Sequence, residues 1–190
     1  KAIQTHPDAK ILAFVHAETS TGVRSDAEAL CGMAKSAGML SIVDAVTSLA
    51  GIDLQVDAWG ADVVYSGTQK CLSSLPGIAP ITFSADAVEM IATRKRKVQS
   101  WFLDMNLIMG YWGEGAKRAY HHTAPVNAIY ALHEALLMLE EEGLQASFAR
   151  HKANHLVLTK GLSELGLKLA VSEPWRLPQL NAVLIPDGQD

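Results

Sequence analysis

The chain has 190 residues, of which 49% are hydrophobic, 19% charged and 6% aromatic, so it can bury a core and does not resemble a disordered chain. A net charge of −4 argues against binding to nucleic acid or to an anionic membrane and favours small-molecule chemistry. The two cysteines, Cys31 and Cys71, form no CxxC motif, which argues against a disulfide framework or structural zinc and favours a reducing compartment.

Strands and helices alternate in the first half of the chain. Short apolar runs predict strands at residues 10–16, 39–43, 61–65 and 78–83. Between the first two, Asp26 offers an N-cap for a helix over residues 27–37, and Gly38 ends it. Because the strands are apolar on both faces, the pattern predicts an α/β fold with a mostly parallel sheet between helices.

The second half is richer in helix. Apolar periodicity and end signals predict helices over residues 85–98, from about Pro125 to residue 142, and over residues 144–165, followed by strands at residues 166–171 and 180–186. We place a domain boundary near Gly143. Residues 1–143 would form part of a large α/β domain, and residues 144–190 would begin a smaller α+β domain.

Polar segments follow three of the predicted strands, at residues 16–22, 44–48 and 66–70. Ligands of an open parallel sheet bind beyond the carboxyl ends of its strands, so Asp44 and Lys70 are expected to face one crevice. A lysine amine in a dry crevice can form a Schiff base, and a carboxylate there can keep a pyridine nitrogen protonated. The pair therefore indicates pyridoxal-phosphate chemistry.

Four motifs carry a resemblance to a known family: IVDAVTS at residues 42–48, YSGTQK at 65–70, HAETSTGV at 16–23 and YHHTAPV at 120–126. Together they resemble the class V, fold type I pyridoxal-phosphate aminotransferases, most closely the alanine–glyoxylate and serine–pyruvate branch. The resemblance covers essentially the whole chain. It implies the large domain of fold type I plus the start of the small domain.

The resemblance also implies a role for each matching residue. Lys70 would be the Schiff-base lysine and the general acid/base. Asp44 would pair with the pyridinium nitrogen and Val46 would pack on one ring face. Thr19 would make a polar contact to the cofactor, and Gln69 would contact its phosphate.

Two further residues imply a homodimer, because Tyr120 and Thr123 would reach the phosphate in the neighbouring subunit. The implied reaction moves an amino group from alanine or serine to glyoxylate or pyruvate. Small amino acids and 2-oxo acids are thus the expected partners, and we expect no nucleic acid, membrane or metal partner.

In this family the phosphate-binding Gly-Thr turn precedes the segment matching His16, and the arginine that binds the substrate carboxylate follows the segment matching Asp190. We therefore expect the chain to be the middle portion of a longer protein and to be inactive alone. We expect a cytoplasmic location, with an organelle such as the peroxisome left open because both true termini would be missing.

Several alternatives stay open: 2-aminoethylphosphonate transaminase, phosphoserine aminotransferase, cysteine desulfurase, or an inactive truncated module. A desulfurase needs a nucleophilic cysteine on a mobile loop, which fits neither Cys31 in a helix nor Cys71 beside the lysine. His151 and His155 lie four residues apart without an intervening Glu, which favours a half-exposed helix face over a metal site.

Overall fold

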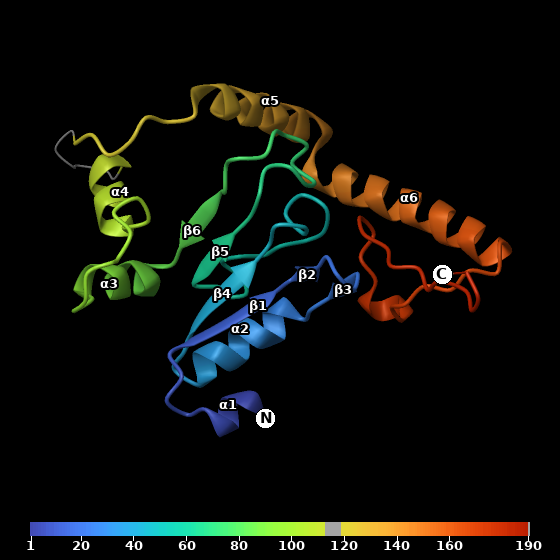
Figure 1. The fold of residues 1–190 in the computed structure, drawn as a ribbon, viewed down its shortest axis with the longest axis horizontal. Coiled ribbons are helices and arrows are strands. Elements are labelled where there is room, and N and C mark those ends of the chain that lie inside the picture. The colour runs from blue at the N-terminus through green and yellow to red at the C-terminus, as the bar shows by residue number, and fades with distance from the viewer. Residues whose placement is uncertain (113–118, 190) are drawn as a thin grey trace.

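The computed structural model describes residues 1–112 and 119–189. Its centre is a four-stranded sheet in the order β1 (Ile11–Val15), β4 (Leu40–Asp44), β5 (Val63–Tyr65) and β6 (Ile81–Phe83) (Figure 1). The first three strands are parallel, which confirms the mostly parallel sheet. β6 runs antiparallel to β5, because the chain between them returns as a loop without a crossover helix.

Helix α2 (Ala27–Ser36) covers one face of the sheet (Figure 1). Its N-cap is Asp26, whose Oδ1 accepts a hydrogen bond of 3.0 Å from the backbone of Ala29, as predicted. The core beneath it consists of small and β-branched side chains: Cys31, Val43, Ala45, Ala61 and Val64. Small residues let the helix backbone approach the sheet closely, so burial of this layer stabilises the central strands.

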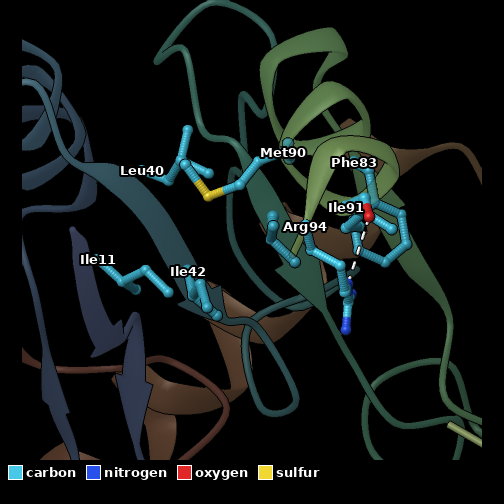
Figure 2. A pocket seen from close by; sticks show the side chains of 9 residues that line it. Ile11, Leu40, Ile42, Phe83, Met90, Ile91 and Arg94 are labelled. Carbon is cyan, nitrogen blue, oxygen red and sulfur yellow. Dashed lines mark hydrogen bonds between the residues drawn. The ribbon is translucent and has the colours of Figure 1, made fainter. Parts of the chain in front are cut away.

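An apolar groove of about 350 Å³ lies against the strands and helix α3 (Ala85–Thr93). Figure 2 shows its walls, which are formed by Ile11, Leu40, Ile42, Val63, Phe83, Ala87, Met90, Ile91 and Arg94. Apart from the Arg94 guanidinium, whose Nε donates to the Ile91 carbonyl at 3.3 Å, these side chains are hydrocarbon or thioether, so the groove holds no cluster of polar groups.

Helix α3 is shorter than predicted. It begins at the N-cap Ser84 and ends at Thr93, where the backbone of Arg94 turns extended. The predicted continuation to residue 98 is wrong, and the sequence at 94–97 supplies the reason. Four adjacent cations would repel one another within a helical turn.

Asp62 ties the amino-terminal side of the sheet together. Its carboxylate accepts hydrogen bonds of 2.8 Å from the Ser41 backbone and 2.8 Å from the Ser84 hydroxyl. Its own N–H donates to the Ser41 hydroxyl at 2.9 Å. These contacts join β4, the start of β5 and the N-cap of α3, and thereby hold the strands in register.

The second half contains α4 (Met105–Trp112), α5 (Val126–Glu142) and α6 (Leu144–Glu164). The last two confirm the predicted helices, and they join at Gly143, whose φ of +83° suits glycine. The buried Ser147 hydroxyl of α6 donates to the Ala50 carbonyl at 3.0 Å and so fastens α6 to the loop after β4. No helix in the described residues is long and apolar enough to cross a membrane.

The two strands predicted near the carboxyl end are wrong. Residues 166–171 and 180–186 lie side by side, but their pairing is an isolated bridge between Leu169 and Val183. A single pair of short extended segments has too few ladder hydrogen bonds to form stable strands.

Several short elements were not predicted: α1 (Ala2–Thr5), β2 (Ala17–Glu18), β3 (Val23–Arg24), α4 and a 3₁₀ turn at Glu173–Trp175. Most of these elements have only two or three residues, fewer than one helical turn or two repeats of the alternating pattern of a strand. Sequence periodicity therefore cannot reveal these shortest elements.

Candidate functional site

The carboxyl ends of the three parallel strands form one edge of the sheet. Val15, Asp44 and Tyr65 are register partners across β1, β4 and β5, each at the last position of its strand. The polar segments 16–22, 44–48 and 66–70 therefore leave the sheet from the same edge (Figure 1), as the sequence predicted.

Asp44 is half-buried at this edge, and both its carboxylate oxygens accept hydrogen bonds. Oδ1 accepts from the Val46 N–H at 2.9 Å, and Oδ2 accepts from the Tyr65 hydroxyl at 2.7 Å. The bond to the carboxylate raises the pKa of the Tyr65 phenol, because a carboxylate favours the protonated donor. Tyr65 was not among the predicted site residues, although its position at a strand end beside Asp44 was the available signal.

Thr19 lies close to the segment that follows Asp44. Its hydroxyl is 2.9 Å from the hydroxyl of Thr47, which is buried directly after Val46. Thr47 thus holds the exposed Thr19 against the loop that follows Asp44. Thr47 was not among the predicted site residues. The signal was weak, because two threonines 28 residues apart carry no recognisable spacing.

Gln69 and Lys70 are exposed on the turn after β5. The turn is anchored by Thr68, which is fully buried and whose carbonyl accepts from the Ser74 N–H at 3.0 Å. A Cβ at Gly67 would lie 2.8 Å from Oε1 of Gln69, so glycine lets that side chain fold back over the turn. The sequence predicted a dry environment for Lys70, whereas its side chain is exposed to water in this chain.

Tyr120 and Thr123 stand apart from this edge. Their hydroxyls are 2.6 Å from each other, and Tyr120 is 74% exposed. Their segment leads from the α4 side into α5, beyond the β6 edge of the sheet (Figure 1). The structure therefore brings Thr19 and Val46 to the Asp44 loop. The Cys71 thiol, 3.8 Å from the Thr47 carbonyl, places the turn that carries Lys70 against the same loop, whereas Tyr120 and Thr123 are not brought to it.

The donor set at the edge fits the cofactor that the motifs imply. A carboxylate with one accepting direction already used on each oxygen can still accept from a pyridinium N–H. The hydroxyl of Thr19 and the amide of Gln69 suit ring and phosphate oxygens, and the Lys70 amine is accessible. Within the described ranges no group of three or more His, Cys, Asp or Glu residues comes close enough to hold a metal.

His16 is a buried histidine behind the edge, with its ring edge-on to Trp59 at a centroid distance of 5.4 Å. Burial, reinforced by the positive charge of Arg24, lowers the pKa of His16 from 6.5 to about 4. The ring is therefore neutral in the folded protein at neutral pH.

The buried neutral state of His16 predicts a loss of stability in acid. The unfolded chain takes up a proton near pH 6.5 and the folded one only near pH 4, so this contribution is complete above pH 6.5 and falls as the pH drops toward 4. The free energy of unfolding, measured by urea denaturation, should decrease between pH 7 and pH 4.5 in the wild type. We expect this decrease to be smaller by about 2–3 kcal/mol in His16→Gln. An identical decrease in the wild type and in His16→Gln would contradict this prediction. His133→Gln, which replaces an exposed histidine, is the control and should show the same decrease as the wild type.

Comparison with known proteins places these features in one family. The family model for class V aminotransferases matches residues 2–183. A curated alanine–glyoxylate aminotransferase from Oryctolagus cuniculus is 41% identical over 178 residues, covering 93% of this chain and 45% of that protein.

Two crystal structures are closely similar to this fold. An alanine–glyoxylate aminotransferase from Nostoc sp. has a TM-score of 0.93 and 48% identity, with 98% of this chain and 49% of that chain covered. A ureidoglycine–glyoxylate aminotransferase from Bacillus subtilis has a TM-score of 0.92 and 37% identity, with 98% and 48% covered. The chain spans about half the length of the curated relatives it matches.

Proposed function

The chain belongs to the class V family of pyridoxal-phosphate-dependent aminotransferases, and we propose that its protein transfers the amino group of alanine or serine to glyoxylate or pyruvate, with Lys70 as the Schiff-base lysine. The observation that carries the proposal is the fixed Asp44 carboxylate on the same sheet edge from which the Lys70 turn departs. An acid/base amine and a carboxylate that orients a pyridine ring are the two groups this chemistry requires.

Bound pyridoxal phosphate supplies an electron sink for the bond broken at the substrate α-carbon. In our proposal, Asp44 accepts the N–H of the pyridine ring and thereby keeps that nitrogen protonated. The Lys70 amine would hold the cofactor and would be the general acid/base for the proton at the substrate α-carbon. Because the donor would leave as its oxo acid before the acceptor binds, the proposed reaction would show ping-pong kinetics.

The remaining motif residues take binding roles in the proposal. Val46 packs against one face of the ring, Thr19 makes a polar contact, and Gln69 contacts the phosphate. Tyr120 and Thr123 serve the neighbouring subunit of a homodimer. Support for the last role comes from the exposure of Tyr120 and from the distance of its segment from the chain's own Asp44 edge.

Glyoxylate is the acceptor that the relatives favour, because both the alanine and the ureidoglycine enzymes carry it in their names. We expect the whole protein to convert glyoxylate to glycine with alanine or serine as donor, giving parallel double-reciprocal lines in steady-state assays. A donor panel that includes ureidoglycine and 2-aminoethylphosphonate checks this. Turnover with ureidoglycine or 2-aminoethylphosphonate, but with neither alanine nor serine, would contradict the proposal.

The surroundings of the two cysteines disfavour a cysteine desulfurase. The Cys71 thiol is half-buried, and burial raises its pKa, which keeps it protonated and unsuited to a nucleophilic role. Cys31 is buried in α2. An inactive truncated module, by contrast, would bind no cofactor, so a titration with pyridoxal phosphate followed by visible absorbance tests for it.

The domain boundary and the cellular location also remain proposals. A boundary near Gly143 is supported by the junction of two helices at a positive-φ glycine, and limited proteolysis of the whole protein tests it. The cytoplasmic location is tested by microscopy of the tagged whole protein.

A further inference from the structure

We propose that Tyr65 is a positioning residue that holds the Asp44 carboxylate in the orientation needed to receive the pyridine ring nitrogen. The inference rests on the proposed function, because it assigns a task to Tyr65 only through Asp44. Tyr65 lies outside the set of residues that the motifs assigned to the cofactor.

The sheet brings the two side chains together. Asp44 and Tyr65 are direct register partners in the parallel pair β4 and β5. Register partners project from the same face of a sheet, so the phenol extends alongside the carboxylate and its hydroxyl reaches Oδ2 at 2.7 Å. The contact thus depends on strand pairing.

Two donors hold the carboxylate from different elements. The Val46 N–H binds Oδ1 from the loop after β4, and the Tyr65 hydroxyl binds Oδ2 from β5. One hydrogen bond would leave the carboxyl group free to turn about its Cβ–Cγ bond. With one donor on each oxygen, the plane of the group is fixed.

The Tyr65 hydroxyl also bears on the contact between Asp44 and the ring nitrogen. A phenol donates a stronger hydrogen bond to a carboxylate than to a carboxylic acid. When a ring N–H approaches, this donor favours the ion pair over transfer of the proton from the ring to Asp44. Tyr65 therefore helps to keep the proton on the pyridine nitrogen.

Tyr65 makes further contacts that do not involve its hydroxyl. The residue borders a small apolar hollow together with Leu49, Leu54 and Pro80, and its carbonyl accepts from the Ala45 N–H at 2.8 Å. A Tyr65→Phe substitution keeps both of these contacts and removes only the hydroxyl. It therefore isolates the hydrogen bond to Asp44.

The test uses the whole protein, stripped of cofactor and titrated with pyridoxal phosphate. We expect Tyr65→Phe to weaken cofactor binding about tenfold, the scale of a hydrogen bond to a charged group. In an Asp44→Asn background the same substitution should change affinity less than about twofold, because the carboxylate it acts on is absent. With ring-¹⁵N-labelled cofactor, NMR should report a smaller protonated fraction of the ring nitrogen in Tyr65→Phe.

Two results would overturn the inference. One is unchanged affinity and an unchanged ¹⁵N signal in Tyr65→Phe, and the second is an equal loss in the Asp44→Asn background, which indicates a merely structural role. If Asp44→Asn itself leaves cofactor affinity unchanged, the proposed function fails along with the inference. As a control, Ser36→Ala removes an exposed hydroxyl of α2 that donates to the Gly32 carbonyl, and it should leave cofactor affinity unchanged.

Discussion

Replacing Lys70 by Ala is expected to reduce amino transfer in the whole protein by about 10⁴-fold or more, because one amine both holds the cofactor and transfers the proton. The side chain is exposed on a turn anchored by Thr68, so its truncation should leave the fold intact. The measurement is single-turnover kinetics together with the visible absorbance of the lysine-bound cofactor, which should vanish.

The control for this variant is Lys152→Ala, which removes an exposed lysine from α6 and should leave activity unchanged. A small primary amine added to Lys70→Ala should restore part of the lost rate, since it supplies the missing base. If the lysine-type absorbance persists in Lys70→Ala, the assignment of Lys70 is wrong.

Asp44→Asn is expected to lower kcat by about 10²–10³-fold, the scale of losing one preorganised electrostatic group. The amide keeps the shape of the carboxylate. It has one accepting oxygen, so it can accept from the Val46 N–H or from the Tyr65 hydroxyl, but not from each on a separate oxygen. It carries no negative charge, so it cannot hold the ring nitrogen protonated. The kcat for alanine and glyoxylate, together with cofactor affinity, measures the loss.

Asp62→Asn is the matched control, because Asp62 is a half-buried carboxylate at the opposite end of the same strand pair. It should lower the free energy of unfolding, since it weakens the hydrogen bonds from Ser41 and Ser84, and leave cofactor affinity unchanged. An equal loss of cofactor affinity in both variants would show that Asp44 acts through general stability.

Much of the fold was predictable because its signals are local. The apolar runs that became β1 and β4, the Asp26 cap of α2 and the periodic stripe of α5 are each written within a few residues. The convergence of Asp44 and the Lys70 turn followed as well, because parallel strands end at one edge of a sheet.

Features that join distant residues could not be read from local patterns. The antiparallel direction of β6 depends on where the 66–80 loop returns, and the failed strands near the carboxyl end depend on having ladder partners. The hydrogen bond between Thr19 and Thr47 joins residues that are 28 positions apart, and the sequence around neither threonine predicts it.

The sequence by itself determined the four central strands, helices α2, α5 and α6, the family and the edge at which the polar segments meet, because propensity, capping and motif order are properties of neighbouring residues. Only the tertiary structure decided which atoms meet at that edge. It paired the Asp44 carboxylate with the Tyr65 hydroxyl and left Lys70 open to solvent. The physical reason is that strand register, set by the whole sheet, determines which side chains lie within hydrogen-bonding distance.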